Sequence, residues 1–214
     1  MDQTLPYLWE HTEDWYSDAT RHSYSHGVAH MRKEVEANNK IPNKWINPLE
    51  TRLPLAPDLK IYCFYGIGKP TERAYFYRES HLAKVTHNRT SAMIDTEVNA
   101  ANGPNGPVDH GVIMGEGDGT VPLLSNGYMC NRGWSIKRYN PAGVKVIPYE
   151  MPHEPDRFDP RGGPNTGDHV DILGRTSLND LILRVAGGKG DLIEPTVYSN
   201  IKEYADKVKI YEEE

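Results

Sequence analysis

The sequence has no long apolar run and no cluster of basic residues. Nothing in it approaches the roughly 18 consecutive apolar residues that a membrane-spanning helix needs. Residues 1–20 are acidic and lack the apolar core of a secretory signal, so no targeting signal is recognisable. The net charge is −6 and the 24 basic residues are dispersed, which argues against a nucleic-acid-binding protein.

Hydrophobic residues are also scarce. They make up 37% of the chain with glycine left out, whereas typical globular proteins have about 45–50% with glycine counted. The sequence contains 19 glycines and 16 prolines, more than the usual share for 214 residues. This composition predicts a loop-rich globular protein, or a piece of one.

Cysteine is sparse, with one residue at Cys63 and one at Cys130. An even count permits one disulfide, but two buried thiols in a reducing compartment fit the count equally well. Asn88-Arg89-Thr90 is a glycosylation sequon. Because such triplets often arise by chance, it supports a secretory location only weakly.

The sequence changes in character near residue 50. Residues 1–50 hold three of the four tryptophans and a helix-like stretch at 28–37, and we expect them to form a cap or lid-like segment. Short strands are predicted at 60–65, 74–77, 112–114 and 144–149, with a loop at 99–107. An amphipathic helix is predicted from Ser177, where Ser177 and Asp180 resemble a capping box, and a last helix at 201–208.

The order of these elements predicts an α/β fold. A strand, an acidic turn, a strand, a histidine loop and a helix follow one another, as in the second half of an α/β-hydrolase core. In that fold the catalytic triad has the chain order Ser, then Asp or Glu, then His. We therefore expect residues 51–214 to form the C-terminal half of an α/β-hydrolase core, preceded by the cap-like segment 1–50.

Asp118 and His169 are the candidate catalytic residues. Asp118 follows the strand at 112–114 on a glycine-rich turn, where a carboxylate can hold an imidazole in one tautomer. His169 lies on a later loop that leads into a helix. Asp118 as an aspartate that satisfies its own turn, and His169 as a surface histidine, remain plainer interpretations. The rival acids are Glu116, Asp168 and Asp171, of which the last two lie too close to the histidine in sequence to reach its Nδ1 easily.

The sequence contains no candidate serine nucleophile. Gly-x-Ser-x-Gly is absent, so neither the strained serine turn nor its oxyanion donors are recognisable. A thiol nucleophile at Cys63 or Cys130 is disfavoured, because neither cysteine has a cationic neighbour that would lower its pKa.

No cofactor or metal site is predicted. Residues 66–71 resemble a phosphate-binding loop but lack its first glycine and its final Ser or Thr. Three histidines recur every four residues, as metal ligands on a helix would: His22, His26 and His30. Gly27 weakens such a helix, so we do not expect a metal there.

Three stretches resemble one family, the lecithin:cholesterol acyltransferases, and within it the phospholipid:diacylglycerol acyltransferases. They are residues 62–75 (YCFYGIGKPTERAY), 117–122 (GDGTVP) and 168–174 (DHVDILG), in the order and spacing of that family. The resemblance covers about residues 40–214. It implies that Asp118 is the acid of a Ser-His-Asp triad, that His169 is its base, and that Cys63 and Cys130 form a disulfide.

The resemblance also implies a location and a missing part. A disulfide belongs in an oxidising compartment, and for a full-length member of the family this is the lumenal side of the endoplasmic reticulum. The serine, the oxyanion loop and the membrane anchor of the family would lie upstream of Met1. The chain is therefore expected to be the C-terminal part of such an enzyme.

The activity implied is transfer of an acyl group from a phospholipid to diacylglycerol, which forms triacylglycerol at a membrane surface without a cofactor or a nucleic-acid partner. Two alternatives remain open. One is a phospholipase with the same triad and water as the acceptor. The other is a catalytically dead fragment, with an unpaired strand edge that predicts poor solubility when the chain is expressed alone.

Overall fold

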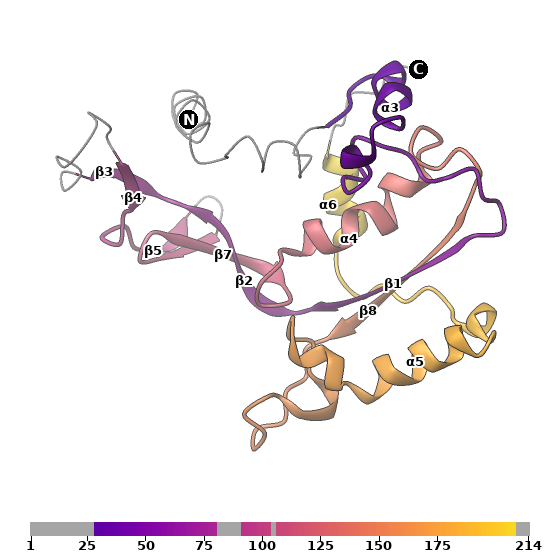
Figure 1. Ribbon diagram of the computed structural model, residues 1–214. Helices are drawn as coiled ribbons and strands as arrows, with labels where there is room; N and C mark the ends of the chain where they lie inside the picture. The colour runs from indigo at the N-terminus through magenta and orange to yellow at the C-terminus, as the bar shows by residue number, and fades with distance from the viewer. Residues whose placement is uncertain (1–27, 81–90, 104–105, 209–214) are drawn as a thin grey trace. The chain divides into compact units, whose positions relative to one another are not determined.

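The computed structural model describes residues 28–80, 91–103 and 106–208 (Figure 1). Helices and strands are mixed along this part of the chain, which fits an α/β fold. The chain divides into two compact units. One comprises Met1–Ile61, Arg132–Val146 and Asp206–Glu214, and the other comprises Tyr62–Asn131 and Ile147–Ala205. The cap-like role expected of residues 1–50 stays a prediction.

The second unit is built on two paired strands, β1 (Lys60–Ile67) and β8 (Lys145–Pro152), whose first residues belong to the other unit. The backbone N–H of His153, just after β8, donates to Ile67 O at the end of β1, at 2.8 Å. The carboxyl ends of both strands therefore lie together. In α/β sheets this is the edge at which functional side chains gather.

Helices cover both faces of this strand pair. Tyr62 and Phe64 pack into a cluster with α5 (Thr176–Ala186), whereas Tyr65 and Ile67 pack with α4 (Leu123–Asn131) and α6 (Ile201–Lys207). Figure 1 shows α5 on one side of β1 and β8, and α4 and α6 on the other. The alternation follows from the two-residue period of a strand, and it makes a three-layer arrangement.

Helix α5 confirms the predicted amphipathic helix but not its predicted cap. Leu178 and Leu181 are buried on its inner face, as their spacing indicated. The N-cap is Arg175, without a side-chain hydrogen bond, so the capping box was wrong. Ser177 Oγ instead accepts a hydrogen bond from Arg175 Nε at 2.8 Å.

Residues 69–117 form an excursion that leaves the end of β1 and returns to it. A four-stranded antiparallel sheet has the order β2-β7-β6-β5. Its strands are β2 (Lys69–Tyr75), β7 (Val112–Gly117), β6 (Gly106–Asp109) and β5 (Ala100–Gly103). β3 (Tyr77–Ser80) and β4 (Ser91–Ile94) form a separate antiparallel pair.

The strand predicted at 112–114 is confirmed as part of β7, which leads into Asp118, but it lies in the four-stranded sheet and not beside β1 and β8 as the expected core order implied. The second prediction about this segment was wrong. The predicted loop at 99–107 contains β5 and the start of β6. Main-chain hydrogen bonds to a neighbouring strand impose this structure on a glycine- and proline-rich segment, and composition does not reveal such bonds.

The first unit holds α3 (Arg32–Asn38) and two short 3₁₀ helices, η1 (Pro42–Lys44) and η2 (Gly133–Ser135). Glu34 Oε2 accepts the backbone N–H groups of His30 and Met31 at 2.7 and 3.0 Å, which lowers the pKa of Glu34 and starts the helix. The segment 132–146 joins this unit through Tyr139, whose carbonyl accepts Leu53 N at 2.8 Å.

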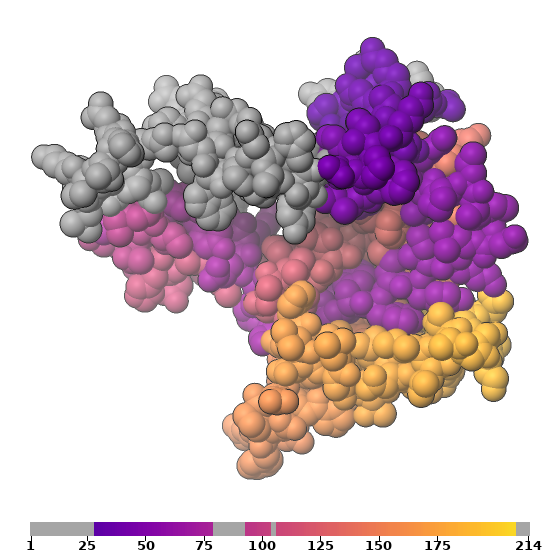
Figure 2. Space-filling model, in the orientation of Figure 1, coloured from indigo at the N-terminus to yellow at the C-terminus, as the bar shows by residue number. Residues whose placement is uncertain are grey.

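A long loop connects β8 to α5. Its residues 154–161 are all exposed and lie at the surface in Figure 2. After them come two 3₁₀ helices, η3 (Gly163–Asn165) and η4 (Asp171–Gly174), and a third, η5 (Gly190–Leu192), follows α5. His169 lies between η3 and η4, so the path of this loop decides where the imidazole points.

Candidate functional site

Asp118 lies where the excursion rejoins the end of β1. It forms a parallel bridge with Lys69, the first residue of β2. A Cβ atom at Gly66, near the end of β1, would collide with Gly167 O and would lie 3.3 Å from Asp118 Cβ. Glycine at this position therefore allows both the acidic turn and the histidine loop to close over the strand end.

The Asp118 carboxylate is buried and accepts four hydrogen bonds. Oδ1 accepts the backbone N–H groups of Thr120 and Val121 at 3.0 and 2.7 Å. Oδ2 accepts Asn126 Nδ2 at 3.0 Å and His169 Nδ1 at 2.8 Å. Burial alone would raise the pKa of Asp118, but these hydrogen bonds outweigh it and hold the pKa below its ordinary value.

His169 meets Asp118 through both its backbone and its ring. Its backbone N–H donates to Asp118 O at 2.9 Å, and Nδ1 donates to the carboxylate. This assigns the ring proton to Nδ1 and leaves Nε2 as a proton acceptor. The His169 side chain is 43% exposed, and within the described residues Nε2 has no hydrogen-bond partner. The ring can therefore take a proton from a group that approaches from outside the chain.

The three rival acids do not bind His169 Nδ1. Asp168 forms an ion pair with Lys69, which lowers the pKa of Asp168 to about 2. Asp171 is the first residue of η4 and its backbone N–H donates to Asp168 Oδ1. Burial raises the pKa of Glu116 on β7, and the nearby charge of Glu150 adds to that shift. Asp118 is thus the acid that the fold places against the histidine.

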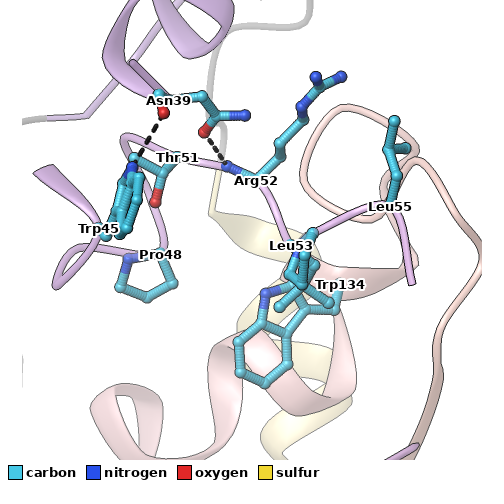
Figure 3. Close-up of a pocket in the computed structure, with 9 residues that line it drawn as sticks. Asn39, Trp45, Pro48, Thr51, Arg52, Leu53, Leu55 and Trp134 are labelled. Carbon is cyan, nitrogen blue, oxygen red and sulfur yellow. Dashed lines mark hydrogen bonds between the residues drawn. The ribbon is translucent and has the colours of Figure 1, made fainter. Parts of the chain in front are cut away.

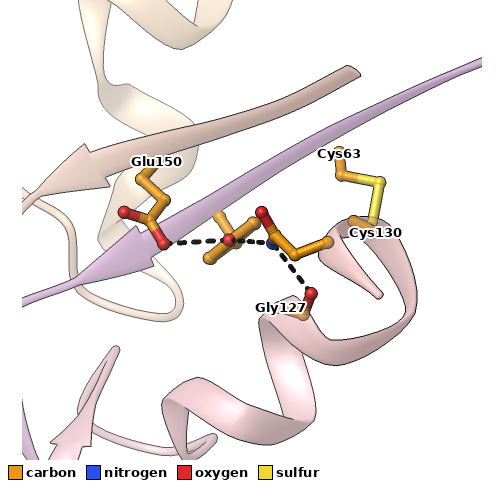
Figure 4. Close-up of a disulfide and its surroundings, with 6 residues drawn as sticks. Cys63, Gly127, Cys130 and Glu150 are labelled. Atoms are coloured by element: carbon orange, nitrogen blue, oxygen red, sulfur yellow. Dashed lines mark hydrogen bonds between the residues drawn. A yellow bond between two sulfur atoms is a disulfide. The ribbon is translucent and has the colours of Figure 1, made fainter. Parts of the chain in front are cut away.

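Helix α4 carries Asn126 and is fixed against β1 in two ways. Cys63 on β1 and Cys130 on α4 form a disulfide (Figure 4). Gly127 allows a close approach, because a Cβ atom there would lie 2.7 Å from Ile201 Cγ1 and 3.0 Å from Tyr65 Oη. Helix α4, which supplies the Asn126 donor to Asp118, is therefore held rigidly against β1. The site lies at the end of that strand.

A second buried carboxylate, Glu150, anchors the chain that leads into α6. Oε2 accepts the backbone N–H groups of Tyr198 and Ser199 at 2.6 and 2.7 Å. Oε1 accepts Ser199 Oγ at 2.6 Å and Tyr65 Oη at 2.9 Å. Burial and the neighbouring Glu150 raise the pKa of Tyr65, so its hydroxyl stays protonated and continues to donate.

The histidine loop has its own buried anchors. Arg175 Nη1 donates to three backbone oxygens, at 2.7, 2.9 and 3.1 Å: those of Pro152, Asn165 and Thr166. His153 Nδ1 accepts Gly167 N at 3.1 Å, and burial, together with nearby Lys69, lowers the pKa of His153, which favours its neutral form. These contacts define the path of the loop ahead of His169.

Sequence reasoning missed several residues of this site. Asn126, His153 and Arg175 carried no recognised signal. Asn126 lies on a helix that was not predicted, although its partner Asp118 is near in the sequence. His153 and Arg175 bind backbone groups. Lys69 was noticed only as part of a failed phosphate-loop motif. Its position between the end of β1 and the start of β2 could have been predicted only if residues 69–117 had been recognised as a separate excursion.

Neither cysteine can serve as the nucleophile, because both are in the disulfide. His22 and His26 of the histidine repeat lie outside the described residues. Across 28–80, 91–103 and 106–208, no group of three or more metal-binding side chains gathers. In the same ranges no helix has the length and apolar character to span a bilayer.

An apolar groove of about 630 Å³ lies within the first unit (Figure 3). Trp45 and Pro48 line one side, and Leu53 and Trp134 line the other. Asn39 supports this arrangement, because its carbonyl accepts Trp45 Nε1 at 2.9 Å and its Oδ1 accepts Arg52 N at 3.0 Å. The groove thus combines a polar frame with apolar walls.

Comparison with known proteins identifies one family. Residues 1–176 match the family described as lecithin:cholesterol acyltransferase. No solved structure matches the chain.

The curated relatives are named as phospholipid:diacylglycerol acyltransferases. The chain is 44% identical over 98% of its length to the Schizosaccharomyces pombe enzyme, of which it covers 32%. It is 41% identical over 91% of its length to the Saccharomyces cerevisiae enzyme, of which it covers 27%. It is 38% identical over 87% of its length to phospholipid:diacylglycerol acyltransferase 1 of Arabidopsis thaliana, of which it covers 28%.

The chain therefore spans about a third of the length of the curated relatives that it matches. The family match nevertheless covers most of the chain, and it includes the turn that carries Asp118 and the loop that carries His169. The chain belongs to the lecithin:cholesterol acyltransferase family, which is a family of enzymes.

Proposed function

We propose that this chain is the C-terminal portion of an α/β-hydrolase-type phospholipid:diacylglycerol acyltransferase, and that it supplies the acid and the base of a Ser-His-Asp triad. The observation that carries the proposal is the 2.8 Å hydrogen bond from His169 Nδ1 to the buried carboxylate of Asp118. It leaves Nε2 on an exposed ring edge, where a serine from the preceding part of the protein can meet it. The names of the relatives support the reaction.

In the first half of the proposed reaction the serine attacks the acyl ester of a phospholipid. Its hydroxyl proton moves to His169 Nε2, and Asp118 stabilises the imidazolium that forms. The tetrahedral intermediate then collapses to an acyl-serine. The proton on Nε2 passes to the departing lysophospholipid oxygen, so the histidine is neutral again.

In the second half diacylglycerol replaces the leaving group. Its hydroxyl gives a proton to Nε2 and its oxygen attacks the acyl-serine. Collapse releases triacylglycerol and returns the proton to the serine. Asp118 suits both halves, because its lowered pKa keeps it ionised while the imidazole gains and loses its proton.

We further propose that the enzyme works on the lumenal side of the endoplasmic reticulum, at a membrane surface that holds both lipid substrates. The disulfide between Cys63 and Cys130 supports this location, because such bonds persist in oxidising compartments.

The test uses the full-length protein in membranes that contain phosphatidylcholine with a labelled acyl chain, together with diacylglycerol. Labelled triacylglycerol should form in equal amount to lysophospholipid. His169→Ala should lower the rate by about 10³-fold or more, as loss of a triad base does elsewhere. The matched control is His110→Ala, which removes an exposed histidine that also contacts a carboxylate. This control should leave the rate unchanged.

Two outcomes would contradict the proposal. Labelled free fatty acid in place of triacylglycerol would show a phospholipase with the same triad. A transcript with a stop codon in frame just ahead of Met1 would leave the protein without a serine nucleophile and make it a catalytically dead remnant.

A further inference from the structure

We propose that Lys69 and Asp168 form a positioning pair that holds the His169 loop against the Asp118 turn and so fixes the direction in which the imidazole points. The inference rests on the catalytic role proposed for His169. Neither residue touches the reacting atoms, so both would act through the histidine.

The backbone of Lys69 lies next to the acidic turn that carries Asp118. It follows Gly68, whose φ of 82° turns the chain out of β1, and its backbone forms the bridge with Asp118. Thr71 Oγ1 fixes the same corner, because it donates to Lys69 O at 2.9 Å and accepts Gly119 N at 2.8 Å. The backbone of Lys69 is therefore part of the framework that holds the acid.

The side chain of Lys69 then crosses the turn. A Cβ atom at Gly119 would lie 2.7 Å from Lys69 Cδ, and Gly119 has a φ of 93°. A residue with a side chain at position 119 would displace the lysine stem and would also strain the backbone. The glycine next to Asp118 thus leaves a path along which the ammonium group reaches the histidine loop.

The partner of Lys69 is Asp168, which directly precedes His169 in the sequence. Lys69 Nζ pairs with Asp168 Oδ2, while Oδ1 accepts Val170 N and Asp171 N at 3.1 and 3.2 Å. One carboxylate thus binds the lysine and also fixes the backbone on the far side of the histidine. The side chain of Asp168 is 20% exposed, so this contact is only partly screened by solvent.

His169 depends on this support because its ring is held at one end. Within the described residues the hydrogen bonds of the ring are limited to the one at Nδ1, and 43% of the side chain is exposed. Arg175 and His153 anchor the loop before the histidine, and the pair anchors it at Asp168. Without the pair, the imidazole could tilt while it keeps its bond to Asp118. Displacements of about 1 Å can cost up to 10²-fold in rate.

The pair is tested in the full-length protein by two readouts. One is acyl transfer, and the other is the rate at which a fluorophosphonate labels the catalytic serine, which needs no lipid acceptor. Lys69→Met keeps the stem over Gly119 but removes the charge. It should lower kcat and the labelling rate about tenfold and leave KM unchanged, and Lys69→Arg should restore both rates to within about twofold.

Two comparisons separate positioning from general stability. Arg184→Met removes an ion pair of 2.8 Å with Asp180 on α5, and it should change neither rate. Combining Lys69→Met with Asp168→Asn should cost no more than the larger single change, since both remove one contact. Asp168→Asn alone should lower the labelling rate about as much as Lys69→Met, because it removes the same contact.

The outcomes distinguish this inference from the proposed function. If His169→Ala abolishes labelling while Lys69→Met stays within twofold of the wild type, the positioning pair is wrong and the triad stands. If His169→Ala leaves labelling intact, both are wrong. If Lys69→Met fails to fold, Asp168→Asn decides, because a labelling rate within twofold of the wild type in that variant overturns the inference.

Discussion

Among the described residues of the second unit, two carboxylate–imidazole contacts have nearly equal lengths. His169 Nδ1 lies 2.8 Å from Asp118 Oδ2, and His110 Nδ1 lies 2.7 Å from Asp109 Oδ1. The surroundings differ strongly. The side chain of Asp118 is 7% exposed and accepts three further hydrogen bonds, whereas the side chain of Asp109 is 81% exposed.

The comparison shows that distance alone does not distinguish the pair that we propose to be catalytic from an exposed one. Around Asp109, water competes for the carboxylate, and an exposed pair of this kind contributes at most about 1 kcal/mol. Around Asp118, fixed donors replace water, so the charge is oriented before any substrate arrives. The two contacts also differ in origin, because Asp109 and His110 are adjacent in one tight turn, while the fold must bring Asp118 and His169 together.

The sequence predicted the two residues but not their setting. Glycines around Asp118, a loop before a helix at His169 and their order along the chain indicated an acid and a base. The three other donors to Asp118 lie close to it in the sequence, but their arrangement was not recognised. Asn126 is the clearest case, since it lies on α4, a helix that was not predicted.

Helix α4 escaped prediction for a physical reason. Its sequence contains Gly127 and two asparagines, which disfavour a helix, and it lacks a regular apolar period. Packing overrides these propensities, because Gly127 fits against Ile201 and the disulfide at Cys130 ties the helix to β1. The excursion at 69–117 was missed similarly, since its strands pair with one another rather than with the core.

The largest difference between the two contacts should appear on neutralising each carboxylate in the full-length protein. Asp118→Asn leaves a similar shape but cannot stabilise the imidazolium or hold its tautomer, so kcat for acyl transfer should fall about 10³- to 10⁴-fold. Asp109→Asn should leave kcat within twofold of the wild type. Equal effects of the two substitutions on kcat would mean that the buried contact and the exposed contact do not differ in function.

A smaller effect is expected from filling the space next to the contact between Asp118 and His169. Gly66→Ala places a methyl group against Gly167 O and close to Asp118, so either the acidic turn or the histidine loop must move. We expect a loss of about 1–3 kcal/mol in the free energy of unfolding and a lower kcat.

The control for Gly66→Ala is Gly174→Ala, at the end of η4, where a Cβ atom would meet nothing within 4 Å. This change should stay within about 0.5 kcal/mol of the wild type. Denaturant unfolding of the three proteins measures both effects, and equal losses would mean that Gly66 has no special role at the strand end.

The smallest effect tests one of the donors around Asp118. The pKa of Asp118 is held below its ordinary value, so the ionised carboxylate stabilises the fold at a pH above that ordinary pKa. This contribution is lost as the pH falls through the lowered pKa. Asn126→Ala removes a 3.0 Å hydrogen bond, so the pKa of Asp118 should rise and acid unfolding should begin at a higher pH.

Melting temperatures measured between pH 6 and pH 3 should therefore fall earlier for Asn126→Ala than for the wild type. The loss at pH 6 should be only about 1 kcal/mol, as for a typical hydrogen bond. Asp109→Asn should follow the wild-type curve, because solvent already surrounds that carboxylate. If Asn126→Ala also followed it, the two backbone donors and His169 would suffice to hold the charge on Asp118. The lowered pKa of Asp118 would then depend on the turn and on His169, and not on the donor from α4.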